Sequence, residues 1–326
     1  MQPLRVGVVG LNARVERQVL PGVAASTRAR LAAVCSRDLA KARRMAEPYA
    51  DCRAFDDYSA MLATGGVDAV FVMTPPEQHA AMSLAALEAG CAVMCEKPLA
   101  ATLDEARAMA SAARRSGQRT AVNFTYRTSP GFRLVERLLD DPGIGEPLHV
   151  ELSYLQGRGL TQPGPFRGAL VDLGPHAFDA LLWWLGPISR IGAVSDPAGL
   201  SWALAGRLGS GATLAATISR VAAGRGNAVL VTLSGRDGAI RLEFDVEDVR
   251  VTRAAAGTTE WREVPIPAEL ALDYATFPRV HWDRIVGALR GEEQFPDFEQ
   301  GLRVQEVIAA AARSDERGEL VALPLA

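Results

Sequence analysis

The first 120 residues alternate between short apolar runs and longer stretches with helical character. The apolar runs, which predict strands, are residues 4–9, 29–35, 69–73, 92–95 and 120–122. The stretches between them, which predict helices, are residues 15–25, 39–47, 58–62, 77–89 and 103–115. Because the runs are continuously apolar rather than alternating, the strands are expected to be buried on both faces. This order and the short loops predict a doubly wound parallel sheet.

The second half of the chain has a different pattern. The expected helices are residues 130–140, 175–185, 274–289 and 298–314, and a loop rich in Gly and Pro covers residues 157–168. The expected strands are residues 148–155, 188–194, 202–208, 213–219, 228–234, 239–244 and 249–253. The last six follow one another with turn signals between them, which predicts an antiparallel meander.

These patterns predict an α/β chain of two domains, as its 326 residues also favour. Residues 1–122 are expected to form an N-terminal Rossmann domain, a doubly wound parallel sheet that binds a dinucleotide. Residues 123–326 are expected to form a C-terminal α/β domain with a large, mostly antiparallel open sheet.

Composition excludes several function classes. A net charge of −3 and a pI near 5.9 give no electrostatic reason to expect nucleic acid or an anionic membrane as partner. The chain has no apolar run of transmembrane length and starts without secretory features. Four cysteines without a CxxC pair are expected to be reduced, which is typical of a cytoplasmic enzyme. No spacing of His, Asp and Glu suggests a metal site.

The turn after the first strand carries part of a dinucleotide-binding pattern. In a GxGxxG turn, backbone amides approach a pyrophosphate at the start of the next helix. Here Gly10 is present, but Asn12 and Val15 stand at the second and third glycine positions. We predict that the cofactor lies along this turn, and that Arg14 pairs with a phosphate. The residues expected to contact it are Gly10, Asn12, Ala13 and Arg14. A strand–turn–helix with only a structural role is the alternative.

The end of the second strand bears on the choice of cofactor. It reads Ser36-Arg37-Asp38. An acidic residue at the strand tip reads the ribose of NAD, whereas Ser36 and Arg37 suit the 2′-phosphate of NADP. We therefore predict NADP. Asp38 keeps NAD possible. In the structural alternative, Arg37 is a solvated loop residue and Asp38 caps the following helix.

Lys97 is one of only two lysines among 35 basic residues. Arginine cannot replace lysine where a compact ammonium or a departing proton is needed. Lys97 comes two residues after the strand expected at residues 92–95, and parallel sheets offer these strand ends to ligands. The alternative is a lysine without a function on a surface loop.

Three segments carry a resemblance to a known family. They are Met73-Thr74-Pro75-Pro76-Glu77-Gln78-His79, Glu96-Lys97-Pro98 and Asp172-Leu173-Gly174-Pro175-His176-Ala177-Phe178-Asp179. With these segments the whole chain resembles the Gfo/Idh/MocA oxidoreductases. The resemblance implies hydride exchange between a nicotinamide cofactor and a sugar, polyol or related secondary alcohol or ketone. It also implies a homodimer or homotetramer that assembles through the C-terminal sheet.

The resemblance also implies roles for individual residues. Lys97, His176 and Asp172 match the family's catalytic lysine and its Asp/His pair. The cofactor is expected along Thr74, Pro75, Pro76, His79, Glu96 and Lys97. Asn123, Tyr126 and Arg127 follow the domain boundary, where they either line the substrate cleft or anchor the crossover. Substrate contacts are expected at Asn123, Tyr126, Arg127, Arg167 and Asp179.

Hydride transfer to a ketone needs a proton for the developing alkoxide, and a group that titrates near neutrality supplies it best. Gly174-Pro175 predicts a helix start that places His176 in the first turn. Asp172 is expected to fix the tautomer of His176, with Asp179 as the alternative partner. Asp172 as a helix cap is the structural alternative. The sequence leaves open whether Lys97 or His176 donates the proton.

Two other functions stay open at this point. One is an enzyme of the same fold that uses NAD to oxidise a sugar transiently and then eliminates a glycosidic substituent. The other is a non-catalytic binding or regulatory protein, which the incomplete glycine pattern allows. The set of Lys97, Asp172 and His176 favours the oxidoreductase.

Overall fold

The structure is a computed structural model that describes residues 2–64, 66–141, 143–159, 161, 168–245, 248–273 and 275–325. It divides into two compact units. The first is Met1–Phe124 with Asp273–Gln305, and the second is Thr125–Leu272 with Glu306–Ala326. The first division lies two residues after the predicted boundary, but Asp273–Gln305, which we had expected in the C-terminal domain, belongs to the first unit.

The first unit is built on a six-stranded parallel sheet. Its strands are β1 (Leu4–Val9), β2 (Ala29–Cys35), β3 (Arg53–Phe55), β4 (Ala69–Val72), β5 (Ala92–Cys95) and β6 (Thr120–Val122), in the order β3-β2-β1-β4-β5-β6. The order reverses between β1 and β4, and the carboxyl ends of strands at such a point are where open α/β sheets bind ligands. β3 was not predicted, because three residues at the edge of a sheet form no apolar run.

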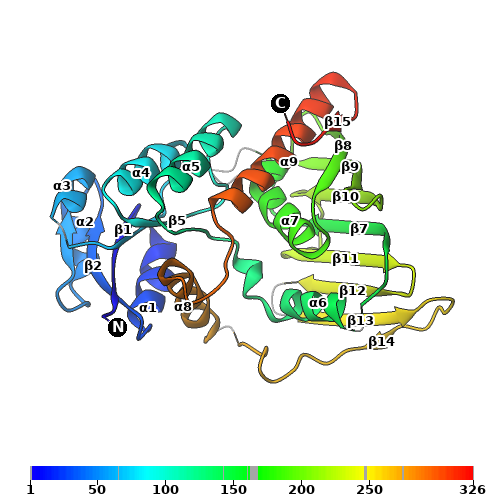
Figure 1. Ribbon diagram of the computed structural model, residues 1–326, viewed down its shortest axis with the longest axis horizontal. Coiled ribbons are helices and arrows are strands. Elements are labelled where there is room, and N and C mark those ends of the chain that lie inside the picture. Colours follow the sequence, from blue (N-terminus) through cyan, green and yellow to red (C-terminus); the bar gives the residue numbers. More distant parts are fainter. Residues whose placement is uncertain are drawn as a thin grey trace. The chain divides into compact units, whose positions relative to one another are not determined.

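Helices cover both faces of this sheet (Figure 1). They are η1 (Val15–Val19), α1 (Leu20–Ala24), α2 (Leu39–Ala46), α3 (Tyr58–Ala63), α4 (Pro76–Glu88), α5 (Leu103–Ser116) and α8 (Phe277–Arg290). The predicted helix over 15–25 is correct in place, but its first part, η1, is a π-helix. α4 and α5 lie on one face, and α1 and α8 lie on the other.

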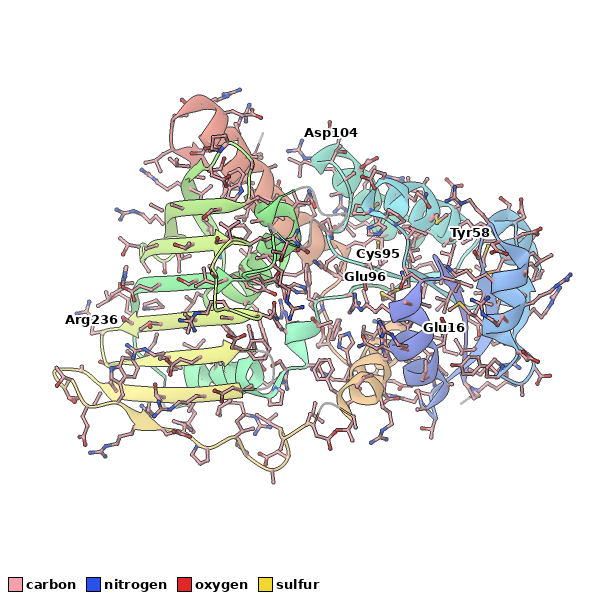
Figure 2. All side chains as sticks on the ribbon, turned by 180° about the vertical axis from the view of Figure 1, so that it is seen from behind. Glu16, Tyr58, Cys95, Glu96, Asp104 and Arg236 are labelled. Carbon is pink, nitrogen blue, oxygen red and sulfur yellow. The ribbon has the colours of Figure 1, made fainter. Side chains whose placement is uncertain are left out.

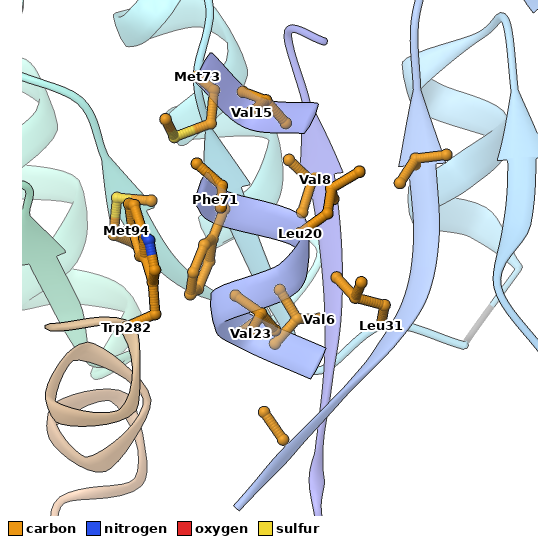
Figure 3. Packing of buried hydrophobic residues seen from close by; sticks show 14 of the residues in the cluster. Val6, Val8, Val15, Leu20, Val23, Leu31, Phe71, Met73, Met94 and Trp282 are labelled. Carbon is orange, nitrogen blue, oxygen red and sulfur yellow. The ribbon is translucent and has the colours of Figure 1, made fainter. Parts of the chain in front are cut away.

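The core of the first unit includes a side chain from the late helix α8. Trp282 is 2% exposed and its ring centroid lies 5.7 Å from that of Phe71 on β4. Figure 3 shows Trp282 beside Phe71 and Met94 under the sheet. Segment Asp273–Gln305 therefore completes the hydrophobic core of the first unit.

The second unit contains a nine-stranded, mostly antiparallel sheet. Its strands are β7 (Pro147–Leu155), β8 (Ile188–Ser195), β9 (Ser201–Leu208), β10 (Thr213–Ser219), β11 (Ala228–Gly235), β12 (Gly238–Asp245), β13 (Asp248–Ala255), β14 (Arg262–Glu263) and β15 (Val321–Ala322). The order is β14-β13-β12-β11-β7-β10-β9-β8-β15. The predicted simple meander is wrong at one point, because β7 lies between β10 and β11 and runs parallel to β10. This central position pairs the backbone groups on both edges of β7.

The remaining helical elements are η2 (Thr125–Arg127), α6 (Pro130–Asp140), α7 (Ala169–Leu185) and α9 (Phe298–Arg317). α6 packs on β12 and β13, and α7 packs on β7, β9 and β10. α7 begins at Ala169, so the predicted start at Pro175 is wrong and Pro175 lies inside the helix. The helix passes through Pro175 because Gly174 has no Cβ to clash with the proline ring. No helix in the described part of the chain is long and apolar enough to cross a membrane.

Candidate functional site

The turn after β1 packs directly against the backbone that follows β4. Gly10 has φ +90°, and a Cβ at this position would lie 2.5 Å from the backbone nitrogen of Thr74. Only glycine allows both this conformation and this approach. The hydroxyl of Thr74 is a buried oxygen without a hydrogen-bond partner in the described residues. The turn and Thr74 thus fit the phosphate-side edge of a dinucleotide site.

Asn12 uses its side chain within the turn. Its Oδ1 accepts hydrogen bonds from the backbone N–H groups of Arg14 (2.9 Å) and Val15 (3.1 Å). In a glycine-only turn, such N–H groups would point at a phosphate. The ammonium of Lys41 donates to the Leu11 carbonyl at 2.6 Å. The ammonium of Lys41, from the first turn of α2, therefore lies beside the turn that follows β1.

The residues after β2 separate into two roles. Arg37 is exposed. Asp38 caps α2, because its Oδ1 accepts from the backbone N–H of Lys41 at 3.0 Å. The capping role, which was the structural alternative for Asp38, is thus the one found.

Glu96 accepts hydrogen bonds from three donors at the end of β5, beside Cys95 (Figure 2). Its Oε1 accepts from Asn123 Nδ2 at 2.6 Å and from Arg14 Nη1 at 2.8 Å. Its Oε2 accepts from the backbone N–H of Lys97 at 3.1 Å. Arg14, which we expected to pair with a phosphate, is therefore paired with Glu96 here.

Asn123 is held from its other side by His281 of α8. Asn123 is 0% exposed, and its Oδ1 lies 2.7 Å from Nε2 of His281. Burial, with Arg14 and Arg284 nearby, lowers the pKa of His281 to about 3, so the imidazole is neutral. It must donate from Nε2, since the amide oxygen only accepts. This fixes the amide of Asn123 with Nδ2 toward Glu96.

Asn123, a predicted substrate contact, thus uses both amide atoms inside the protein. The sequence did not single out His281 or its hydrogen bond. No local pattern could have revealed this bond, because the partners are 158 positions apart.

His79 lies at the start of α4 and is 0% exposed. Nδ1 is 2.9 Å from the carbonyl oxygen of Pro98, and Nε2 is 2.8 Å from that of Thr74. Both ring nitrogens thus face protein carbonyls rather than a cofactor. Pro75 is the N-cap of α4 and Pro76 is its first residue. These two predicted cofactor residues therefore form the start of the helix, three to four positions before His79.

In the second unit, Asp172 lies in the first turn of α7, whose N-cap is Gly168, and His176 lies one turn further along the helix. The prediction that His176 occupies the first turn of a helix is therefore wrong, as is the alternative that Asp172 caps one. Side chains at i and i+4 share a helix face. Asp172 is 7% exposed and its Oδ2 lies 3.8 Å from Nε of Arg220. Arg220, just after β10, was not singled out by the sequence, where nothing distinguishes it from other arginines.

Tyr126 belongs to a closed ring of hydrogen bonds. Tyr154 donates to Oδ1 of Asn227 at 3.0 Å, and Nδ2 of Asn227 donates to the Tyr126 hydroxyl at 3.0 Å. Tyr126 must then donate to Tyr154, 2.8 Å away. Burial raises the pKa of Tyr126 to about 12. The Tyr126 hydroxyl proton is therefore used in the hydrogen bond to Tyr154. The Tyr126 ring lies beside the His176 ring, with ring centroids 4.9 Å apart.

The predicted substrate residues Arg127 and Asp179 bind each other. Nε and Nη2 of Arg127 donate to the two carboxylate oxygens of Asp179, both at 2.8 Å. The Asp179 side chain is 2% exposed. The guanidinium of Arg127 also lies 4.4 Å from the ring centroid of Trp183. This ion pair links η2 to α7. Arg127 therefore has the anchoring role that was the alternative to lining the substrate cleft.

Two other expectations concern positions and groups beyond these contacts. Arg167, a predicted substrate residue, lies outside the described residues. Within the described ranges, no group of three or more His, Cys, Asp and Glu side chains could hold a metal ion.

Comparisons with protein families match both halves of the chain. Residues 4–124 match the model of an oxidoreductase family with an NAD-binding Rossmann fold, named GFO_IDH_MocA. Residues 132–241 match the GFO/IDH/MocA C-terminal domain. The two matches follow in the order of the two units.

Individual relatives extend these matches. Inositol 2-dehydrogenase 1 of Saccharopolyspora erythraea is 32% identical over 99% of this chain and 97% of its own length. D-glucoside 3-dehydrogenase of Escherichia coli is 33% identical over 56% of this chain, but the match spans only 54% of that protein. Among solved structures, an oxidoreductase domain protein from Kribbella flavida is 27% identical, with full coverage of both chains and a TM-score of 0.87.

Proposed function

Because this chain belongs to the Gfo/Idh/MocA oxidoreductase family, we propose that it exchanges hydride between a nicotinamide cofactor and a sugar or polyol. The observation that carries the proposal is the environment of Glu96 and Lys97 at the end of β5. The names of the glucoside and inositol dehydrogenases support a secondary alcohol, or its ketone, as the reacting group.

The cofactor supplies or accepts the hydride. In this proposal the Gly10 turn receives its phosphate side, and Thr74 and Glu96 lie along it. An NADP preference is supported by exposed Arg37, which suits a 2′-phosphate. The carboxylate of Asp38, which would otherwise read the ribose of NAD, already caps α2. A cytoplasmic location remains part of the proposal.

Lys97 and His176 are the proposed proton-handling residues. An ammonium at Lys97 stabilises a developing alkoxide electrostatically. Imidazole at His176 can give or take a proton near neutral pH, and Asp172 supports its charged form. Tyr126 is a poor donor by comparison, because its proton serves the ring with Tyr154 and Asn227. We therefore assign Tyr126 to orienting the His176 ring.

Fluorescence titration with NADPH and NADH tests the cofactor part. We expect wild type to bind NADPH more tightly, and Arg37→Ala to lose about tenfold of NADPH affinity with little change for NADH. Arg236→Ala is the control, since Arg236 is an exposed arginine of the second unit. Failure to bind either nucleotide would sink the proposal, whereas tighter NADH binding would remove only the NADP preference.

Turnover of inositols and glucosides tests the chemistry. Lys97→Met and His176→Asn should each lower kcat by about 100-fold or more, while the nucleotide dissociation constant changes little for His176→Asn. Arg236→Ala, an exposed substitution in the β11–β12 turn, should leave kcat unchanged. Full activity of a Lys97→Met, His176→Asn double variant would contradict these roles.

A homo-oligomer through the second unit's sheet is also part of the proposal. The sheet face opposite α7 exposes small side chains, including the paired Ala205 of β9 and Ala215 of β10. A second copy can approach such a surface closely. Sedimentation should show a dimer or tetramer for wild type and a smaller species for Ala205→Arg. A wild-type monomer would contradict it.

A further inference from the structure

His79 faces two acceptors at once, in a site closed to solvent. Its exposure is 0%, and each ring nitrogen lies within 2.9 Å of a backbone carbonyl oxygen. A carbonyl oxygen only accepts, and a neutral imidazole has one donor and one acceptor nitrogen. One nitrogen of a neutral ring would therefore set its lone pair against an oxygen. Both contacts are favourable only if both nitrogens carry protons.

The two carbonyls belong to the segments that form the proposed cofactor edge. Thr74 follows β4, and its backbone nitrogen faces Gly10 of the first turn. Pro98 immediately follows Lys97. We infer that His79 is a buried imidazolium whose two hydrogen bonds tie the Thr74 turn to the Lys97-Pro98 segment, making it a positioning residue for Lys97. The protonation of His79 is independent of the proposed function. The importance of His79 for catalysis, however, rests on the proposed function.

The surroundings of His79 are compatible with this charge. The segments packed against α4 carry Tyr58 of α3, Cys91 just before β5 and Cys95 at its end, Glu96 and Lys97 after it, and Asp104, Glu105, Arg107, Arg114 and Arg115 of α5; α4 itself carries Glu77 and Glu88. Burial lowers the pKa of His79, but the electrostatic interaction and hydrogen bond with Cys95, together with the two carbonyl hydrogen bonds, outweigh it and raise the pKa to about 9. Tyr58 donates to a carbonyl of α4, and Asp104 is 92% exposed.

The pH dependence follows from this direction. The folded-state pKa lies above the unfolded value near 6.5. The stability contributed by the two hydrogen bonds of protonated His79 is therefore fully present below pH 6.5 and is lost as pH rises through about 9. His281 provides an internal contrast, because its pKa is lowered to about 3 and its ring stays neutral over the same range.

Nitrogen-15 NMR of the four histidine rings tests the protonation directly. In wild type at pH 7, we expect the His79 ring to have both nitrogens protonated, and to lose one proton near pH 9. The His79→Gln variant assigns that ring by its disappearance. An unprotonated nitrogen in the His79 ring at pH 7 would overturn the inference, whether or not the protein binds a nucleotide.

Hydrogen exchange tests the positioning role without a cofactor. In His79→Gln, peptides covering residues 96–99 should exchange at least about tenfold faster, because glutamine offers a donor to only one of the two carbonyls. The control is His149→Gln, which removes a half-exposed histidine of β7. Equal exchange of residues 96–99 in wild type and His79→Gln would overturn the role.

A titration with NADH tests whether the hydrogen bonds of protonated His79 affect cofactor binding. In wild type, the dissociation constant should rise by about tenfold as pH passes through 9, and in His79→Gln it should be raised already at pH 7 and stay level. The same rise in both proteins would assign the pH effect to another group and overturn the positioning role. If wild type binds neither NADH nor NADPH, the proposed function fails, while the NMR and exchange results still decide this inference.

Discussion

Glu96 is the residue on which the contacts of the first unit converge. Its carboxylate accepts from Arg14 in the first turn, from Asn123 after β6 and from the backbone of Lys97. A carboxylate with three donors is a fixed anion, because each hydrogen bond to a charged acceptor restricts its position. The anion adjoins the lysine that the proposed chemistry uses. Neutral His281 donates a hydrogen bond to the amide oxygen of Asn123 and so orients the amide nitrogen of Asn123 toward Glu96.

Replacing Asn123 tests this arrangement. Asn123→Leu leaves the Nε2–H of His281 buried without an acceptor and removes one donor from Glu96. We expect the free energy of unfolding to fall by about 2–4 kcal/mol, since a buried polar group without a partner costs about 1–3 kcal/mol. Urea unfolding at pH 7 measures this.

The double variant Asn123→Leu, His281→Leu separates the two losses. With the imidazole removed as well, only Glu96 lacks a donor, so the loss should be smaller than the sum of the two single losses. Strict additivity would show that Asn123 and His281 do not act together and would contradict the arrangement.

The Arg127–Asp179 pair gives a second prediction at this scale. Arg127→Ala leaves the carboxylate of Asp179, 2% exposed, without its bidentate partner. Loss of one partner from a buried pair costs about 3–5 kcal/mol, whereas an exposed pair contributes about 0–1 kcal/mol. Arg236, labelled in Figure 2, forms an exposed pair with Glu146 and is the matched control. Equal losses for Arg127→Ala and Arg236→Ala in thermal or urea unfolding would contradict the buried role.

Among the secondary-structure elements, those whose pattern reports their environment were predictable. β1 and β2 have the predicted bounds, because strands buried on both faces are nearly continuous apolar runs, here interrupted only by Arg5 and Arg30 near the strand starts. The predicted start of α7 was wrong because proline is common at a first helical position, whereas Pro175 lies inside the helix, after a glycine that has no Cβ to clash with its ring. The place of β7 in its sheet depends on pairing with strands far along the chain, which no local pattern contains.

The candidate site divides in the same way. The strand-end position expected for Lys97 follows from the run that ends at Cys95. Which partners hold a side chain was not predictable: Arg14 pairs with Glu96, and His79 faces two carbonyls. These contacts depend on how β-strand ends from separate segments meet, and residue type alone allows several partners.

Helix α8 is attached to the first unit by ion pairs as well as by its core residues. Nη2 of Arg28 lies 2.5 Å from Asp283 and 2.8 Å from Glu293. Burial raises the pKa of Asp283, but hydrogen bonds from Arg28 and Ser26 outweigh it and lower the pKa. A lowered carboxyl pKa stabilises the fold above the unfolded value near 3.8, and the contribution is lost as pH falls through the folded value.

Arg28→Gln should therefore destabilise the protein in a pH-dependent manner. At pH 7 we expect a loss on the order of 1–2 kcal/mol, which is modest because the pairs are partly exposed to solvent. Below pH 3.8 the difference from wild type should shrink, since protonated Asp283 no longer pairs as an anion. Unfolding followed by fluorescence between pH 7 and pH 3 measures it. A difference that stays constant over this range would contradict the ion-pair role.

At the scale of the whole molecule, the chain leaves the first unit at Phe124 and returns to it at Asp273. The returning segment supplies Trp282 and Ile285 to the core and His281 to Asn123. Gly22 of α1 is in such close contact with Trp282 that a Cβ there would overlap the indole ring. The first unit is thus built from two separate parts of the sequence, and neither its core nor its proposed site is complete in residues 1–124.

This construction predicts the behaviour of fragments. Residues 1–124 alone should not unfold cooperatively, because a missing buried Trp or Ile costs about 2–5 kcal/mol and a whole domain is stabilised by only about 5–15 kcal/mol. A fusion of residues 1–124 to residues 273–305 through a flexible Gly/Ser linker should restore a cooperative transition. The same fusion with Trp282→Ala should lose most of the gain. Calorimetry of the three proteins tests this prediction. A cooperative transition in residues 1–124 alone, at the same temperature as in the fusion, would show that residues 273–305 are not required for the fold of the first unit.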